Sequence, residues 1–546
     1  MLVVRPTGGG KSLIYQVAAT MIKGITLFIS PLLTLASDQT RNLKRKTASL
    51  PDITCIHLDG MPQEHVKIIA QDISELRHPV TNLLKGAVIL FASPQFLTGQ
   101  KGSSILASLI NDKTSALHMT VMDEVHIASQ FGSTFRGEFG LLKSRLYQKL
   151  PSSCRINLFM TGTCNKTIQT NFQKLFGVKI NNMHWPDHHQ MRHRSVSIEL
   201  KYTKLIMKEI KKKCMPLLLA GSTDLSKKII IYSNMREKII NTTKQLELFL
   251  NIDDKLYLTD AISIHGQLSH EEKAVYLKLF MGDELPFESA DIRILLATSG
   301  VANAGIDCSE IYTAIRIEFP PSIMDICQEK GRVGRVPSPS PEVYSYMICF
   351  DIDSFVLLLK RTLNPEQTMT TEYRRSMIND HIAVAKLFCS VNSCFNEVFE
   401  TTLANPSVRI DPGTVGETHR CKICPGCRGE LADMYNPIVI AGAQEILFSA
   451  VTKKPQYTVK EFVDYIWDVP NFSLVLFRRN RQRQNVRKRE LQLFMFQLIA
   501  WEMLIPVFDK ETKQITFKAS IASNESAMYT FQIENSWDKI PQCSLP

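Results

Sequence analysis

The chain contains no apolar run that approaches the roughly 18 residues needed to cross a membrane. Residues 1–6 also lack the charged region and long apolar stretch of a secretory leader. Apolar residues make up 44% of the chain and charged residues 21%, which is ordinary for a folded protein and excludes wholesale disorder. At 546 residues the chain is too long for one hydrophobic core, so we expect three or four domains.

Closely spaced cysteines are also scarce. Of the 13 cysteines, only Cys421, Cys424 and Cys427 lie within a few residues of one another, and the scatter of the rest predicts reduced thiols in a cytosolic or nuclear compartment. Three thiolates two residues apart suit tetrahedral zinc, which requires a fourth ligand. The spacing alone leaves that ligand open. Nothing else in the sequence supports redox chemistry or an iron–sulfur cluster.

The net charge of +11 is a modest surplus for this length, and simple solubility explains most of it. The positive charge does gather in one place. The cluster comprises Arg478, Arg479, Arg481, Arg483, Arg487, Lys488 and Arg489. Such a run either binds the phosphates of a nucleic acid or forms a solvated helix face, and the sequence leaves both open.

Short apolar runs alternate with longer amphipathic stretches in two successive series. The first series comprises residues 25–30, 87–93, 120–123 and 156–160, and the second comprises 228–233, 292–298, 314–319 and 343–349. Nearly continuous apolar strands separated by helices indicate parallel sheets that are covered on both faces. We therefore predict two α/β lobes, with the polar, His-rich stretch 184–194 as the hinge between them.

Polar residues follow several of these predicted strands. They include Ser30, Ser93, the pair Asp123 and Glu124, Thr161 and Thr298. Because ligands of parallel sheets bind at the carboxyl ends of the strands, these positions predict that the functional site lies along that edge of the sheets.

A glycine-rich loop, residues 5–12, lies between the apolar start of the chain and a predicted helix. Its three glycines allow backbone N–H groups to surround a phosphate at the N-terminus of the helix. Lys11 would reach the β- and γ-phosphates, and the Ser12 hydroxyl would bind Mg²⁺. Arg5 stands where the strict phosphate-loop pattern has glycine, and the alternative interpretation is a flexible glycine turn.

Two further motifs suit phosphoryl transfer. Asp123 at the end of its strand can hold Mg²⁺, and Glu124 can orient and deprotonate the attacking water; taken alone, such acids are commonly just solvated. In the second lobe, Arg332 and Arg335 can stabilise the charge that develops on the γ-phosphate. The alternative for these arginines is a basic loop with local salt bridges.

The order of the motifs resembles the superfamily 2 helicases and, within them, the RecQ family. The resemblance covers about residues 1–435 and is carried by residues 6–12, 30–39, 123–126, 161–163, 297–298 through 305–307, and 328–335. It implies ATP between two RecA-like lobes, single-stranded DNA across their tops, and translocation from 3′ to 5′. Family members also carry an adenine-recognition segment before the phosphate loop, and this chain begins too late to contain it.

The resemblance assigns roles residue by residue. It implies nucleotide and Mg²⁺ binding by Thr7, Gly8, Gly9, Gly10, Lys11, Ser12, Asp123 and Asp307. It implies catalysis by Lys11, Glu124, Gln328, Arg332 and Arg335. It implies DNA contact by Ser30, Pro31, Ser93, Pro94, Phe131, Arg136 and Thr298, although the phenylalanines near Phe131 could instead pack in a core. It favours Cys394 as the fourth zinc ligand with Cys421, Cys424 and Cys427, ahead of Cys389 and His419.

The predicted fold is therefore α/β: two RecA-like parallel-sheet lobes, a helical zinc-binding module and a winged-helix-like basic domain. The expected bounds are 1–185, 186–365, 366–435 and 436–546, with an amphipathic helix over 490–504 and a strand over 514–518 in the last part. The predicted activity is that of an ATP-dependent DNA helicase that binds single-stranded and branched or duplex DNA. It would be nuclear if the source is eukaryotic and otherwise cytoplasmic. The alternatives are a DNA-binding protein with a decayed or truncated ATPase, or an ATP-gated DNA clamp that does not unwind.

Overall fold

The computed structural model describes most of the chain. The described residues are 1–5, 10–22, 24–31, 39–41, 43–44, 53–75, 87–110, 117–131, 137–162, 164, 166–178, 182–184, 196–218, 227–251, 260–282, 292–299, 306, 308, 310–335, 344–367, 369, 371–390, 393–403, 421–431, 454, 456–468, 484–500, 502 and 504–519.

Lobe 1 contains a seven-stranded sheet in the order β3-β4-β2-β5-β6-β1-β7, and every neighbouring pair is parallel. Its strands are β1 (Leu2–Val4), β2 (Gly24–Ile29), β3 (Ile53–His57), β4 (Ala87–Ala92), β5 (Leu117–Met122), β6 (Ile156–Thr161) and β7 (Met183–His184). The inner strands β2, β4 and β5 are buried along almost their whole length. That burial is why they consist mostly of apolar residues, with Thr26, His118 and Thr120 as the polar exceptions.

Helices cover both faces of the lobe 1 sheet. They are α1 (Lys11–Ile22), α3 (Gln63–Glu75), α4 (Pro94–Thr98), α5 (Ser103–Ile110), α6 (Val125–Phe131), α7 (Gly137–Arg145) and α8 (Lys166–Phe176). Helix α1 packs on one face through Tyr15 and Ala19. Ile105 of α5, Leu142 of α7 and Phe172 of α8 belong to the core on the other face. The result is the three-layer arrangement expected of a parallel sheet.

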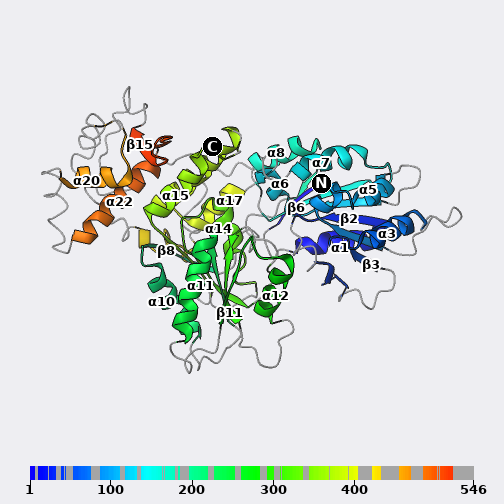
Figure 1. Cartoon of the computed structure of the whole chain (residues 1–546), viewed down its shortest axis with the longest axis horizontal. Coiled ribbons are helices and arrows are strands. Elements are labelled where there is room, and N and C mark those ends of the chain that lie inside the picture. Colours follow the sequence, from blue (N-terminus) through cyan, green and yellow to red (C-terminus); the bar gives the residue numbers. More distant parts are fainter. Residues whose placement is uncertain are drawn as a thin grey trace.

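Lobe 2 contains a six-stranded parallel sheet in the order β10-β11-β9-β12-β13-β8. Its strands are β8 (Val196–Tyr202), β9 (Lys228–Ser233), β10 (Asp260–Ile264), β11 (Ile292–Thr298), β12 (Ile311–Arg316) and β13 (Tyr344–Phe350). Helices α10 (Ile206–Leu218) and α11 (Arg236–Asn251) pack on one face, with α12 (His270–Met281) and α14 (Ile323–Lys330) in the other core. Lobes 1 and 2 lie side by side (Figure 1).

The rest of the described chain is mainly helical. It comprises α15 (Ile352–Leu363), α16 (Thr371–Cys389), α17 (Phe395–Leu403), α20 (Val459–Asp468), α22 (Gln484–Ala500) and the antiparallel pair β14 (Leu504–Phe508) and β15 (Ile515–Ala519). Phe496 of α22 packs on lobe 2, with ring centroids 5.8 Å from Phe319 and 5.7 Å from Phe350. Helix α22 is therefore anchored to the lobe 2 core.

Each of the eight apolar runs identified in the sequence coincides with a strand, which confirms two parallel-sheet lobes. The helix expected over 490–504 instead spans Gln484–Ala500, and Leu504 begins β14. It is also not amphipathic over residues 491–500, where only Gln492 and Gln497 are less than buried, because it lies between other helices and lobe 2. The winged-helix fold stays a prediction. Among the described helices, none is both long and apolar enough to span a membrane.

His381 joins α16 to lobe 2 and is 1% exposed. Its Nδ1 donates to the carbonyl oxygen of Pro321 at 2.6 Å, and its Nε2 lies 2.9 Å from the Thr362 hydroxyl, from which it accepts. Burial lowers the pKa of His381 to about 4. The native structure therefore selects the neutral imidazole, whereas the unfolded chain binds a proton below its ordinary pKa of about 6.5.

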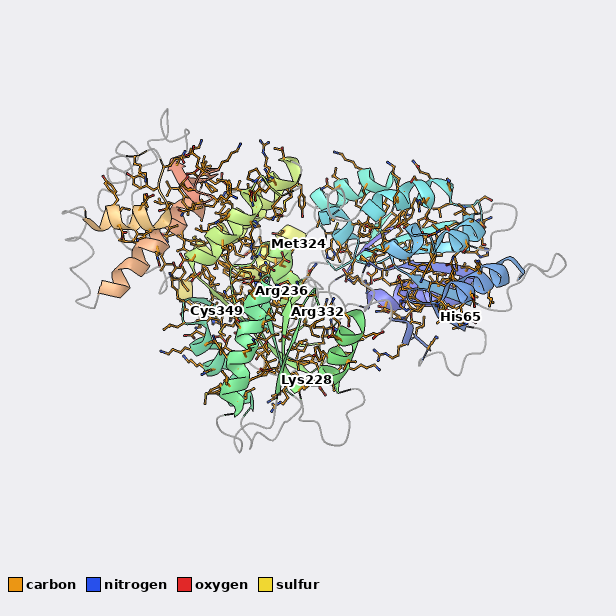
Figure 2. All side chains as sticks on the ribbon, viewed as in Figure 1. His65, Lys228, Arg236, Met324, Arg332 and Cys349 are labelled. Carbon is orange, nitrogen blue, oxygen red and sulfur yellow. The ribbon has the colours of Figure 1, made fainter. Side chains whose placement is uncertain are left out.

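We expect the free energy of unfolding to fall as the pH drops from about 6.5 to about 4, because the unfolded state binds the proton that His381 refuses in the fold. The contribution of this one group is roughly 3 kcal/mol across that window. The His381→Asn variant should have a lower free energy of unfolding than the wild type at pH 7, as measured with urea. That free energy should fall less on acidification than it does in the wild type. His65→Gln, on the exposed surface of lobe 1 (Figure 2), is the control and should keep the wild-type slope. Equal slopes for all three proteins would contradict this prediction.

Candidate functional site

Lys11 lies at the carboxyl edge of the lobe 1 sheet, directly after the glycine-rich loop. Gly10 has φ +79°, a left-handed conformation that glycine adopts without strain, and α1 begins directly after it at Lys11. The Lys11 ammonium lies 3.3 Å from the Glu124 carboxylate, and these side chains are only 11% and 15% exposed. Lys11 and the acidic motif after β5 therefore converge across the edge of the sheet, as the sequence predicted.

The acidic pair stands in two different electrostatic environments. Burial, followed by the charge of Glu124, raises the pKa of Asp123 to about 6. Burial would also raise the pKa of Glu124, but Lys11, His126 and Arg332 outweigh it and hold that pKa well below its ordinary range. Glu124 has φ +49°, which is strained for a non-glycine residue, and the Asp123 carboxylate accepts from its backbone N–H at 2.9 Å. Glu124 is thus held as a carboxylate beside Lys11.

His126 links the two lobes, a role that the sequence analysis missed. Its Nδ1 lies 2.9 Å from the Thr161 hydroxyl at the end of β6 and 3.3 Å from Glu124. Its Nε2 lies 2.7 Å from the side-chain amide nitrogen of Gln328, on α14 of lobe 2. A neutral imidazole with its proton on Nδ1 satisfies both sides, since Nε2 then accepts from the amide. The signal was present in the sequence, because His126 lies only two residues after Glu124.

Helix α14 delivers the lobe 2 residues to this junction. Ser322 caps its N-terminus by accepting from the backbone N–H of Asp325. After the helix ends, Arg332 donates to the carbonyl oxygen of Ile306 at 3.0 Å and acts electrostatically on Glu124 across the lobes. Arg332, labelled in Figure 2, is 6% exposed, and Arg335 follows Gly334, which has φ +68°. Gln328 and Arg332 of lobe 2 therefore meet His126 and Glu124 of lobe 1 at one place.

The residues predicted to contact DNA lie at strand ends. Ser30 and Pro31 are buried after β2, and Thr298 ends β11 half-buried. Ser93 caps α4, its hydroxyl accepting from the backbone N–H of Phe96 at 3.0 Å and donating to Asp59, with Pro94 as the first residue of the helix. The hydroxyl of Ser93 thus has structural partners already, and its exposure is 1%.

Several predicted site residues lie outside the described residues. They are Thr7, Gly8, Gly9, Arg136 and Asp307. Phe131 ends α6, and only its backbone is described.

A buried charged network in lobe 2 was not predicted. Arg316 donates to the Glu329 carboxylate at 2.6 Å and to the Ser299 hydroxyl at 2.7 Å, and Tyr346 donates to Glu329 at 2.7 Å. Arg316 and Glu329 are both 0% exposed. The network joins the segment after β11 to α14, one residue from Gln328. A charged residue inside the apolar stretch of β12 was its only signal in the sequence.

Four thiols come together beside lobe 2. The sulfur atoms of Cys394, Cys421, Cys424 and Cys427 all lie within 4.8 Å of one another, and those of Cys421 and Cys427 are 3.8 Å apart. Zinc–sulfur bonds of about 2.3 Å in a tetrahedron place sulfur atoms roughly 3.8 Å apart, so the cluster fits a zinc ion. Hydrogen bonds from the Cys394 and Cys424 thiols lower the pKa of Cys421 to about 3. Cys389 is not a member of this cluster, and His419 lies outside the described residues.

The cysteine cluster is fastened to lobe 2 by its own loop. Arg428 donates to the carbonyl oxygen of Ile198 at 2.6 Å and to the Ser197 hydroxyl at 2.7 Å, both on β8. Ile198 in turn donates its backbone N–H to Ile423 at 3.0 Å. A Cβ on Gly426 would approach the carbonyl oxygen of Ser393 to 2.0 Å, so only glycine allows the two halves of the cluster to meet.

Two family models match the chain. The DEAD/DEAH box helicase model matches residues 1–170, and the helicase conserved C-terminal domain model matches residues 210–337. Together they cover more than half of the chain and fall on lobes 1 and 2. The fold and the site therefore define a two-lobed helicase core of superfamily 2.

Two relatives indicate which superfamily 2 helicases the chain is similar to. The chain is 28% identical over 352 residues to the ATP-dependent DNA helicase Q-like 4B of Arabidopsis thaliana, covering 63% of this chain and 27% of that protein. It is 25% identical over 347 residues to the ATP-dependent DNA helicase RecQ of Synechocystis, covering 62% and 63%. The chain is therefore similar to the RecQ helicases. It matches less than two thirds of the length of these relatives.

A comparison of structures gives more distant neighbours. The chain is similar to the Mycobacterium smegmatis helicase Lhr bound to ssDNA and AMP-PNP, with a TM-score of 0.47 and 16% identity over 96% of this chain and 57% of that one.

We expect Gln328→Ala to loosen the contact between the lobes, because it leaves His126 Nε2 without the amide donor. Loss of a hydrogen bond worth about 1 kcal/mol would raise the open-to-closed ratio about fivefold. The measurement is energy transfer between one dye on each lobe of the full chain, without nucleotide. Gln245→Ala, which removes an exposed glutamine of α11, is the control. If both variants give the wild-type distance distribution, the contact does not hold the lobes together.

Proposed function

We propose that the protein is an ATP-dependent DNA helicase that translocates 3′ to 5′ on single-stranded DNA. The observation that carries this proposal is the continuous chain of contacts from Lys11 through Glu124 and His126 to Gln328, which spans both lobes. A group bound at Lys11 can alter this chain. Nucleotide binding and lobe movement would then be one event, as a motor requires.

The proposed chemistry assigns a role to each polar group at the edge. Lys11 and the N-terminus of α1 bind the phosphates, and the lowered pKa of Glu124 keeps it ionised; its proposed task is to orient and deprotonate the attacking water. Ser12 and Asp123 would hold Mg²⁺, which neutralises phosphate charge when bound. The buried Asp123 carboxylate, with its raised pKa, fits a cation site of this kind.

Lobe 2 would complete the site on closure. We assign Gln328, Arg332 and Arg335 to this task, with the arginines stabilising the charge that develops on the transferred phosphoryl group. Asp307 and the loop residues Thr7, Gly8, Gly9 and Gly10 are further proposed nucleotide contacts, and they rest on the family resemblance.

Single-stranded DNA would cross the carboxyl edges of both sheets. The proposed contacts are Ser30, Pro31, Ser93, Pro94, Phe131, Arg136 and Thr298. For the buried serines and prolines the proposal rests on the family resemblance, because the backbone N–H groups of Ser30 and Ser93 already donate to Ala92 and Asp59, and proline has no N–H. Branched or duplex DNA would engage the arginine-rich segment 478–489 and a winged-helix-like region after residue 436. We propose a nuclear location if the source is eukaryotic and a cytoplasmic one otherwise.

The four-cysteine cluster is proposed to bind one structural zinc ion. Four thiolates fill the tetrahedral shell and leave no open position for substrate, so the ion would stabilise the fold rather than take part in catalysis. Since zinc–thiolate binding supplies folding free energy, the segment 394–431 should depend on the metal.

We expect Glu124→Gln to retain ATP binding but to lose DNA-stimulated hydrolysis by roughly 10²- to 10⁴-fold, because a neutral amide cannot accept the proton. Lys11→Ala should lose both, since the phosphate-binding ammonium is gone. Phosphate release and fluorescent-nucleotide binding measure the two properties. Glu64→Gln and Lys67→Ala, on exposed positions of α3, are matched controls and should retain wild-type values.

A strand-separation assay completes this test. Hydrolysis without unwinding would replace the helicase proposal with an ATP-gated clamp. Wild-type protein that binds DNA but neither binds nor hydrolyses ATP would indicate a decayed ATPase. Unchanged turnover in Lys11→Ala would remove the assigned site altogether.

We expect the purified chain to contain about one zinc ion, measured by plasma mass spectrometry. Cys424→Ser should lose the metal, because its thiol is fully buried in the cluster and no alternative ligand lies beside it among the described residues. Cys389→Ser is the matched control: this thiol is equally buried at the end of α16 but lies outside the cluster. Zinc retained in Cys424→Ser and lost in Cys389→Ser would reverse the ligand assignment.

A further inference from the structure

Three successive residues at the end of α14 contact three different parts of the molecule. Gln328 reaches His126 in lobe 1, and Glu329 joins the buried network of Arg316. Lys330 donates to the side-chain oxygen of Asn396 on α17. Because successive helix residues project about 100° apart, one turn can serve all three directions. The first two contacts belong to the site described above, and the third does not.

Among the described residues, Lys330 is a buried cation that no carboxylate pairs with. It is 1% exposed, and its ammonium lies 5.6 Å from the ring centroid of Phe399 in addition to its bond to Asn396. Within the described residues it forms no ion pair with an acidic side chain. An amide oxygen and a ring face offset only part of the free energy of removing an ammonium from water. A compensating negative charge is therefore expected nearby.

Lys330 is connected to the four-cysteine cluster through Asn396. Asn396 lies two residues after Cys394, in the first turn of α17, and the backbone N–H of Phe395 between them donates to the Cys424 sulfur at 3.3 Å. Burial lowers the pKa of Lys330, while Cys327, Cys421, Cys424 and Cys394 act against that shift. Three of these four thiols belong to the cluster.

The charge of the cluster depends on the metal. Four thiolates around one Zn²⁺ carry a net charge of about −2, whereas the metal-free cluster, in which not every thiol is ionised, carries less negative charge. We propose that Lys330 is the charge-compensating cation of the four-cysteine zinc site, and that it thereby couples metal binding to the helix that carries Gln328. This inference rests on the zinc binding proposed above and not on the proposed helicase activity.

Lys228 provides a matched comparison in the same lobe. It is 4% exposed and lies 5.7 Å from the ring centroid of Phe280, much like Lys330 and Phe399. Its ammonium, however, is paired with the Glu310 carboxylate at 2.8 Å. Lys228 starts β9, at the end of the sheet opposite to Arg332 (Figure 2). Its removal deletes a buried ammonium without touching the cysteine cluster.

The test is the zinc affinity of the full-length chain, measured by competition with a chromogenic chelator. Second-layer groups around zinc ligands typically change metal affinity by roughly 10- to 100-fold, and we expect a loss of that size in Lys330→Met. Lys330→Arg keeps the positive charge and should retain most of the wild-type zinc affinity. Lys228→Met should bind zinc within about threefold of the wild type, even if it is less stable.

A second variant keeps the test valid if Lys330→Met fails to fold. Asn396→Asp places a carboxylate beside the Lys330 ammonium. The new ion pair would reduce the stabilisation that the ammonium gives to the cysteine cluster, so zinc affinity should fall, as in Lys330→Met. Wild-type zinc affinity in both Lys330→Met and Asn396→Asp would overturn the proposal, as would an equal loss in Lys228→Met. A wild-type chain that binds no zinc would overturn the metal site itself, whatever its ATPase activity.

Discussion

The hydrogen bond between His126 and Gln328 depends on more of the structure than any other contact at the site. His126 reaches the junction because α6 begins directly after the acidic pair at the end of β5. Gln328 reaches it because Glu329, the next residue, is locked into the buried network of lobe 2. A displacement of either element by 1 Å would break the bond, since hydrogen bonds weaken steeply beyond about 3.2 Å. The alignment of the two lobes is therefore set from within each core.

The strands that the sequence revealed are those with a neighbour on each side. Runs such as Ile25–Ile29 and Ile229–Tyr232 are largely apolar because both faces of an inner strand are covered. The strands that were missed include β3, β8 and β10, and each lies at the edge of its sheet. In β8 buried and half-buried residues alternate from Val196 to Tyr202, so no continuous apolar run appears. Edge strands are hidden because one face is only partly covered.

Residues of the site were predictable where one short segment carries the chemistry. Lys11 and Glu124 could be named because loop, strand end and residue type agree locally. The partners of His126 and Arg316 could not, because they lie 202 and 13 residues away and only folding brings them together. Cys394 is an intermediate case. The tight spacing of three cysteines required a fourth ligand, but only the family resemblance selected it, and the coordinates confirm its place in the cluster.

The packing of Phe496 against lobe 2 has a mechanical consequence. Helix α22 and the β14–β15 hairpin lie on the side of lobe 2 away from lobe 1 (Figure 1), and they are joined to its aromatic core. Any rotation of lobe 2 relative to lobe 1 would therefore also move helix α22 and the hairpin. For a given small rotation about the contact at Gln328, the displacement of the hairpin is larger in proportion to its distance from that contact.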